Sequence, residues 1–188
     1  MSHDSERQLI EKYLEKQDEQ ALQTLIERHA TSVYGFVARV IGDANAAEDV
    51  TQETFVKIWK NLKKFDLNKS FKAWLFTIAK NTAFDFLKKK KAIPLSHYRK
   101  EETESLADQI PDTTPLPSEW LEKRDVTKQV IAALAHLSLT ARTVLMLHYK
   151  QELSFQEIAE ILGESIDTVK SRSRRALIQL KKYLLHQT

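Results

Sequence analysis

The sequence predicts an all-α protein made of two small helical domains joined by a flexible, acidic linker that contains proline. Its 188 residues include only 3 Gly and 4 Pro, while 42% are hydrophobic and 29% are charged. Glycine and proline break regular elements, so their scarcity favours long helices joined by short connections. Apolar residues recur every three to four positions over much of the chain, which is the spacing of amphipathic helices.

Proline is confined to one stretch, and that stretch marks the expected domain boundary. All four prolines lie between Pro94 and Pro117, and residues 101–119 carry no basic side chain. Such a segment is too polar to pack and too rich in proline to form one helix. We therefore expect one domain at residues 1–92, a linker at 93–118 and a second domain at 119–188.

Five helices are expected in the amino-terminal domain from the spacing of apolar residues. We expect Gly35 and Gly42 to flank the third helix, and Asp43 to cap the fourth, at residues 46–62. Ser70 is a suitable N-cap for the fifth, which should run nearly to the end of the domain. The inward side of the fourth helix is expected to carry Val50, Phe55, Ile58 and Trp59.

Helix signals in the carboxyl-terminal domain are more specific. Helices are expected over residues 118–136 and 140–149, followed by a capping box at Ser154-Phe155-Gln156-Glu157. The short helix that this box opens should end at Gly163, because glycine takes the left-handed conformation of a helix end without strain. Ser165 then caps a final long helix.

The last two of these helices have the spacing of a helix-turn-helix. Ala159 is small enough for a close helix crossing, Gly163 suits the turn, and Val169 can pack onto the first helix. An ordinary helical hairpin is the alternative. The final helix favours DNA binding, because its polar side is mostly basic, with Arg and Ser near its start. That polar side comprises Asp167, Lys170, Ser171, Arg174, Arg175 and Lys182.

Positive charge is concentrated in two segments. The net charge is only +3, but residues 55–92 carry +9 and residues 165–188 carry +5, which suggests two contacts with polyanions. In the first segment lysines alternate with aromatic residues, a pattern typical of binding to single-stranded nucleic acid. Most of these rings also lie at core spacing, which favours packing for each ring taken singly. Asn81, polar and in mid-helix, is a candidate for reading a base edge.

Composition disfavours most kinds of catalytic site. The sequence has no Cys and only three widely separated Gly, which excludes thiolate chemistry, Cys-ligated metals and glycine-rich phosphate loops. An acidic edge could serve acid–base chemistry or bind a metal, but no histidine has the spacing to complete such a site. Docking of a protein is the better interpretation of this edge, which comprises Glu48, Asp49, Gln52 and Glu53. We expect no enzymatic activity, no cofactor and no metal.

The sequence carries no pattern that would direct it into a membrane. The amino terminus lacks a basic segment followed by an apolar run, and no apolar stretch is long enough to span a bilayer. We therefore expect a cytoplasmic protein without membrane insertion.

Three groups of residues form motifs that are informative when taken together. They are Asp49-Val50-Thr51-Gln52-Glu53-Thr54-Phe55; Trp74-Leu75-Phe76-Thr77-Ile78-Ala79-Lys80-Asn81 with Asp85; and Glu157-Ile158-Ala159 with Thr168-Val169-Lys170-Ser171-Arg172, Arg175 and Ala176. These motifs resemble the signatures of bacterial RNA polymerase sigma factors, and their order and spacing are similar to those of the extracytoplasmic function (ECF) group, which keeps only two of the family's domains. The resemblance implies a factor that binds core RNA polymerase, directs it to specific promoters and promotes melting.

The resemblance also implies roles for individual positions. The domain at 1–92 corresponds to sigma region 2, which binds core polymerase and the minus-10 element, and the domain at 119–188 to sigma region 4, which binds the minus-35 element. Contacts with the clamp helices of the largest polymerase subunit are implied for Asp49, Gln52, Glu53 and Trp59. Capture of a base from the melted minus-10 strand, and contacts with its backbone, are implied for Phe65, Asp66, Leu67, Asn68, Lys69, Lys80, Asn81, Lys88 and Lys89. Minus-35 contacts are implied for Lys170, Ser171, Arg172, Arg174 and Arg175.

Further partners follow from the resemblance alone. They are the flap of the second-largest polymerase subunit and an anti-sigma factor, and the linker takes the place of the segment threaded toward the RNA exit path. Some residues depart from the family's usual pattern, in or near the final helix, and they bear on the minus-35 sequence more than on the fold. They are Ser138, Glu164, Asp167, Ser173 and Leu177.

Two alternative functions lead to different expectations. A polymerase-independent helix-turn-helix transcriptional regulator would give no role to the acidic edge around Asp49 or to Asn81. A helical hydrolase or metalloenzyme would lose activity on changing Glu48 or Glu53. The amino-terminal motifs favour a sigma factor over both.

Overall fold

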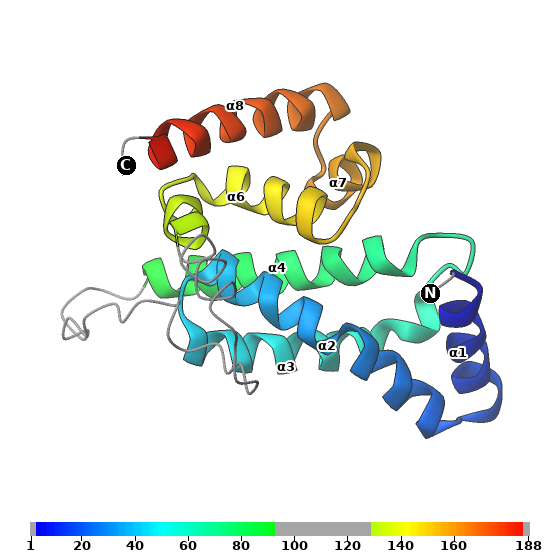
Figure 1. Ribbon diagram of the computed structural model, residues 1–188. Coiled ribbons are helices and arrows are strands. Elements are labelled where there is room, and N and C mark those ends of the chain that lie inside the picture. Colours follow the sequence, from blue (N-terminus) through cyan, green and yellow to red (C-terminus); the bar gives the residue numbers. More distant parts are fainter. Residues whose placement is uncertain (1–2, 93–128, 186–188) are drawn as a thin grey trace, which may run out of the picture.

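The described residues of this computed structural model, 3–92 and 129–185, form helices and turns without a β-strand (Figure 1). This confirms the all-α prediction, while the predicted linker lies outside the described residues. The amino-terminal part consists of α1 (His3–Lys16), α2 (Glu19–Ile41), α3 (Ala44–Asn61), the 3₁₀ turn η1 (Leu62–Lys64) and α4 (Phe71–Ala92). Among the helices described, none has the length and apolar character needed to cross a membrane.

A single helix, α2, takes the place of the second and third helices expected from the sequence. Asp18 caps its start by accepting two backbone N–H groups, and Gly42 ends it in the left-handed region with a φ of 75°. The prediction that Gly35 lies at a helix boundary is wrong, because Gly35 lies inside α2. There Arg39 Nη1 donates to the carbonyl oxygen of Gly35 at 2.9 Å, so the guanidinium covers the space beside the missing side chain.

The amino-terminal core lies between α2, α3 and α4. Phe36 and Phe76 are fully buried in it and meet edge to face, with ring centroids 5.3 Å apart. The predicted caps are confirmed, since Asp43 accepts a backbone N–H in the first turn of α3 and Ser70 does so in the first turn of α4. The short helix α1 packs at one end of this bundle, beside the turn that leads into α4 (Figure 1).

The carboxyl-terminal part forms a second, smaller group of helices. A helical segment at 129–135 leads into α6 (Leu139–Leu145), which continues as the π-helical turn η3 (Met146–Lys150), and then into α7 (Phe155–Leu162) and α8 (Ile166–Leu185). The helix predicted over 140–149 is confirmed, with its last turn widened into a π-helix. The side chains that hold these helices together are buried apolar ones, among them Leu147, Ile158 and Val169.

The two parts pack against each other. Helix α4 contacts α7, and a guanidinium joins α2 to the carboxyl-terminal part. Arg142 Nη1 donates to the carbonyl oxygens of Arg39 (3.0 Å) and Val40 (3.4 Å) in the last turn of α2. The same guanidinium donates to the carbonyl oxygens of Leu134, Ala135 and Leu137. Burial lowers the pKa of Arg142, but arginine stays charged, so a cation lies at the carbonyl ends of two helices.

Candidate nucleic-acid interface

The turn between α7 and α8 is fixed by short-range hydrogen bonds. Ser154 Oγ accepts the Glu157 N–H at 3.2 Å, and Glu157 Oε2 accepts the Ser154 N–H at 2.9 Å, which completes the predicted capping box. Gly163 has a φ of 67°, and the Glu164 N–H reaches back to the carbonyl oxygen of Ala159 at 3.0 Å. With Val169 fully buried against α7, the predicted helix-turn-helix is confirmed.

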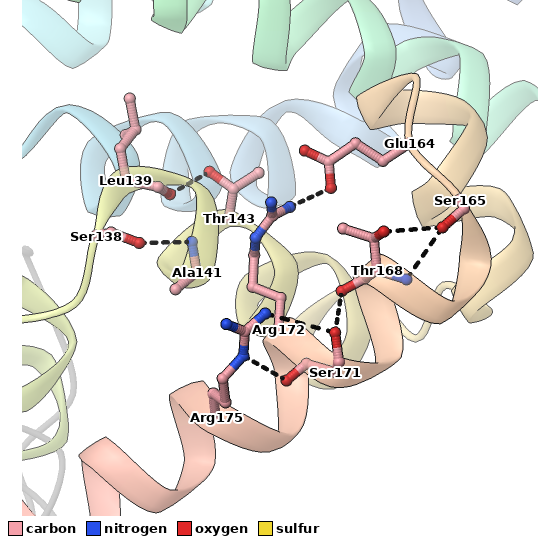
Figure 2. A network of polar contacts seen from close by, with 10 residues as sticks. All are labelled: Ser138, Leu139, Ala141, Thr143, Glu164, Ser165, Thr168, Ser171, Arg172 and Arg175. Atoms are coloured by element: carbon pink, nitrogen blue, oxygen red, sulfur yellow. Dashed lines mark hydrogen bonds and ion pairs between the residues drawn. The ribbon is translucent and has the colours of Figure 1, made fainter.

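A chain of hydrogen bonds orders the exposed side of the first turns of α8 (Figure 2). Ser165 Oγ accepts the Thr168 N–H at 3.2 Å and lies 2.8 Å from Thr168 Oγ1. Ser171 Oγ donates to the carbonyl oxygen of Thr168 at 3.0 Å, and Arg175 Nε donates to that of Ser171 at 3.3 Å. The hydroxyl and the guanidinium are therefore held along one face of the helix by contacts within the protein.

Four of the five predicted minus-35 residues share the exposed face of α8. Lys170, Ser171, Arg174 and Arg175 are all exposed. The fifth, Arg172, is only 24% exposed and forms an ion pair with Glu164 in the turn (Figure 2). A mainly basic, exposed face of this kind can contact phosphates and base edges in a major groove.

Three of the departures from the family pattern have structural roles. Ser138 caps α6 by accepting the Ala141 N–H at 3.3 Å, and Glu164 is the partner of Arg172 (Figure 2). Ser173 is buried at 3% exposure, facing the interior of the carboxyl-terminal part. The other two, Asp167 and Leu177, are exposed on α8.

The predicted acidic edge lies on the outer side of α3. Glu48, Asp49, Gln52 and Glu53 are exposed, and Glu53 forms an ion pair with Lys57 at 2.8 Å. In residues 3–92 and 129–185, no group of three or more His, Cys, Asp or Glu side chains is arranged to hold a metal ion. The edge therefore offers carboxylates and an amide on a rigid helix, as a protein partner with basic side chains would require.

The position of Trp59, near the end of the same helix, differs from the one predicted by the spacing of apolar residues. The prediction that it faces inward is wrong, since it is 50% exposed. Its indole Nε1 donates to the hydroxyl of Tyr13 at 2.7 Å, which holds the ring across the junction of α3 and α1. A large aromatic surface is thus presented beside the acidic edge, where the resemblance places polymerase contacts.

The aromatic residues of the predicted single-strand site are mainly packed. Phe65 is only 9% exposed, and its ring centroid lies 5.5 Å from that of Phe71 and 5.0 Å from that of Trp74. This cluster forms the base on which the following loop rests. The alternative interpretation of these rings as core residues is therefore correct for Phe65 and Phe71.

The loop itself is ordered by an Asx turn. Asp66 Oδ1 accepts the Asn68 N–H at 3.0 Å and the Asn68 side-chain amide at 3.2 Å, and the Lys69 N–H donates to the carbonyl oxygen of Asp66 at 2.9 Å. Leu67 lies half-buried between these polar residues. A cavity of about 410 Å³ opens between this loop and α1.

The remaining predicted minus-10 residues lie apart from the loop, along α4. Asn81 is exposed, is not part of the cavity wall, and lies ten residues into α4, which is about 15 Å along the helix axis. Lys80 is half-buried, with its ammonium 5.7 Å from the centroid of the Phe84 ring. Burial lowers the pKa of Lys80, against the opposing effect of Asp85. Exposed lysines continue the track at Lys88 and Lys89.

Sequence reasoning missed three residues that shape the cavity or hold the two parts of the molecule together. Glu6 and Arg7 on α1 form part of the cavity wall, and Arg142 joins the two parts of the molecule. No motif marks these roles, because the loop opposite Glu6 and Arg7, and the carbonyl groups in α2 that Arg142 binds, are far away in the sequence.

Comparison with known proteins identifies the family. The profile of Sigma-70 region 2 matches residues 25–93, and that of Sigma-70 region 4 matches residues 127–180. The ECF RNA polymerase sigma factor SigW of Bacillus subtilis is 32% identical over 175 residues, covering 92% of this chain and 94% of that protein. This chain belongs to the ECF RNA polymerase sigma factors. The ECF sigma factor SigX of the same species is 27% identical over 166 residues, 88% of this chain and 84% of that protein.

Solved structures agree with this membership. The ECF sigma factor fold of this chain superposes on CnrH, solved in complex with the cytosolic domain of CnrY, with a TM-score of 0.68 and 26% identity over 98% of this chain and 99% of that one. The sigma factor RpoE of Bartonella quintana, solved with the anti-sigma factor NepR, has the same fold, with a TM-score of 0.68 and 24% identity over 86% of this chain and 95% of that one. The resemblance seen in the sequence is confirmed, and the chain is a sigma factor that directs RNA polymerase to promoters.

Proposed function

We propose that this ECF sigma factor reads duplex minus-35 DNA with the exposed face of α8. The observation that carries this assignment is the ordered, exposed row of Lys170, Ser171, Arg174 and Arg175. Arg175 is suited to fork onto a guanine edge, and Lys170 and Arg174 to hold phosphates. Arg172, tied to Glu164, is assigned to a phosphate at the edge of the groove.

The melted minus-10 strand is assigned to the loop and to α4. The ordered loop from Phe65 to Lys69 borders a cavity in which an unstacked base fits, and this supports base capture there. Because Asn81 lies about 15 Å along α4 from the start of that helix, we assign it to a different nucleotide of the same strand. Lys80, Lys88 and Lys89 would follow the backbone.

The binding of core polymerase is assigned to the outer side of α3. Asp49, Gln52 and Glu53, with the exposed ring of Trp59, would bind the clamp helices of the largest subunit, while the carboxyl-terminal domain would meet the flap of the second-largest subunit. The domains proposed are 1–92 and 119–188, joined by the linker at 93–118. A cytoplasmic location, control by an anti-sigma factor and the absence of catalysis by the chain itself complete this proposal.

Run-off transcription with core polymerase tests the proposal. A library of templates randomised across the minus-35 and minus-10 positions should yield discrete promoters only when this chain is present. Arg175→Ala should reduce transcription from minus-35-dependent templates by about 5- to 150-fold, equivalent to 1–3 kcal/mol for a base contact. Lys181→Ala, an exposed basic change further along α8, is the matched control and should have little effect.

A second arm separates this proposal from a polymerase-independent regulator. Reversing charge at Asp49 and Glu53 should weaken recovery of core polymerase in a pull-down. Discrete footprints on duplex DNA without polymerase, together with unchanged recovery of polymerase by the charge-reversed variant, would favour the regulator instead.

A further inference from the structure

The cavity beside the loop has a wall that none of the assignments above uses. It is lined on one side by α1 and on the other by the loop and the first residues of α4. Its volume of about 410 Å³ lies within the usual range for small-molecule sites, about 300–1,000 Å³. The apolar side chains of Ile10, Phe65, Leu67 and Phe71 form part of the lining, and the polar groups include Glu6, Arg7 and Lys69.

The carboxylate of Glu6 lies against a buried histidine. Its Oε1 lies 2.9 Å from Nε2 of His29, and the two side chains are only 20% and 10% exposed. The His29 ring in turn packs on Phe71, with the ring centroids 5.5 Å apart, so the carboxylate and the aromatic lining belong to one cluster. A polar group whose position is fixed in this way discriminates between ligands better than a mobile one.

The helix that carries Glu6 is itself firmly anchored. Ile10 is fully buried, and Tyr13 is 9% exposed and accepts the bond from the indole of Trp59 at 2.7 Å. Helix α1, which forms this wall, is therefore a stably packed part of the amino-terminal bundle. The opposite wall is the loop ordered by Asp66, so contacts within the protein form both sides of the cavity.

The chemistry of this cavity fits a nucleobase with an exocyclic amino group. An ionised carboxylate only accepts hydrogen bonds and offers about four acceptor positions, so Glu6 can accept from an amino group while remaining beside His29. Cytosine, adenine and guanine carry such a group, whereas thymine presents a single ring N–H between two carbonyl oxygens that would repel the carboxylate. Lys69 suits the phosphates of the same strand, and Arg7, which is paired with Glu11 at 2.8 Å, lies on the opposite wall.

We propose that Glu6 is a specificity-determining residue, which selects the captured base by accepting a hydrogen bond from its exocyclic amino group. His29 is a positioning residue, since it acts only through Glu6. This inference rests on the proposed function, because it requires that the loop cavity captures a base of the melted strand.

The test uses holoenzyme reconstituted with the full chain on a pre-melted promoter taken from the library. At each minus-10 position of the non-template strand, the base is replaced by its counterpart without the amino group: cytosine by 2-pyrimidinone, adenine by purine, guanine by hypoxanthine. With the wild-type chain, one position should lose about tenfold or more in open-complex yield. Glu6→Gln should reduce that ratio to within about twofold of one, because an amide both donates and accepts.

Glu15→Gln is the matched control, an exposed carboxylate on the same helix outside the cavity, and it should keep the wild-type ratio. Equal melting temperatures of the two variants would show that α1 remains in place. The inference would be overturned if Glu6→Gln kept the wild-type ratio of open-complex yields between the natural and the altered base. It would also be overturned if active wild-type holoenzyme gave the same yield with and without the amino group at every position. If wild-type protein supports no promoter-specific transcription at all, the proposed function fails, and this inference fails with it.

Discussion

The helix-turn-helix at 154–185 and the loop site at 65–81 are held in place in different ways. The contacts that shape the first lie close together in the sequence: Ser154 and Glu157 are three residues apart, and Glu164 and Arg172 are eight apart. The second combines a local turn at Asp66 with distant partners, since Phe71 packs on His29, which lies 42 residues earlier in the sequence. Local changes should therefore damage the duplex-reading surface selectively, whereas the single-strand site should follow the stability of the whole amino-terminal bundle.

The largest effect expected is from Phe36→Ala in the amino-terminal core. Phe36 is fully buried against Phe76, so the truncation should lower the free energy of unfolding by about 3–5 kcal/mol. Hydrogen exchange should show lost protection throughout α2 and α4, with α7 and α8 much less affected. Val56→Ala, at a 45% exposed position, should cost less than about 0.5 kcal/mol. If Phe36→Ala reduced hydrogen-exchange protection equally in α2, α4, α7 and α8, the helix-turn-helix would not be stabilised independently of the amino-terminal bundle.

The next effect concerns the guanidinium that joins the two regions. Arg142→Ala removes bonds to five carbonyl oxygens and should lower the free energy of unfolding by about 2–3 kcal/mol, as for hydrogen bonds made by charged groups. Because the sequence has no Cys, single dye-labelled cysteines can be placed at Lys60 and Lys181. Energy transfer between them should fall in Arg142→Ala.

Arg142→Lys sharpens this test, since an ammonium keeps the charge but cannot fork onto both helix ends. It should fall between the wild type and Arg142→Ala in transfer efficiency. Wild-type transfer in both variants would mean that the contact between α4 and α7 alone holds the two parts together.

The same division explains what the sequence could predict. The caps at Asp43, Ser70 and Ser154 and the left-handed turn at Gly163 are set by a few neighbouring residues, so each was correctly predicted. Gly35 was misplaced because glycine is also tolerated inside a helix, where Arg39 packs over it. This contact is itself local, since Arg39 follows Gly35 by four residues on the same helix, but the spacing of apolar residues does not reveal it.

The long-range features could not be read from spacing. Trp59 has the spacing of a core residue, but its hydrogen bond to Tyr13 holds it half-exposed. Glu6 belongs to no sequence motif, because the role proposed for it depends on its contact with His29 and on a loop about sixty residues away. The family resemblance supplied roles for the loop residues but none for α1, which is why the cavity wall emerged only from the structure.

Two glycines, one in the amino-terminal bundle and one in the helix-turn-helix, allow the same substitution to be compared in both regions. Gly42 and Gly163 both end helices with positive φ, 75° and 67°, and neither has an atom within 4 Å of where a Cβ would lie. Alanine at either position should therefore cost about 1–2 kcal/mol from backbone strain alone. Gly163→Ala should also reduce minus-35-dependent transcription, because it re-aims α8, whereas Gly42→Ala should leave the minus-35 preference unchanged. Run-off assays on templates with and without a minus-35 element separate the two, and equal losses would contradict the local positioning of α8.

The smallest effect expected is from Lys80→Met. This change should make the folded protein slightly more stable but promoter opening weaker. Burial lowers the pKa of Lys80 in the folded protein below its ordinary value of 10.5, so the folded state binds this proton less tightly than the unfolded state. The resulting penalty is present in full at neutral pH and is relieved as the pH rises toward 10.5. Replacing the ammonium by an apolar group should thus raise the melting temperature slightly at pH 7, and this gain should shrink at higher pH.

Promoter opening should nevertheless become weaker in Lys80→Met, because the proposed backbone contact is lost. Lys89→Met, at an exposed position on the same helix, should weaken opening without any gain in stability. Thermal melting from pH 7 to pH 10, combined with permanganate detection of the melted strand, measures both effects. A lower melting temperature for Lys80→Met at pH 7 would mean that the contact of this ammonium with the Phe84 ring outweighs the cost of burying it.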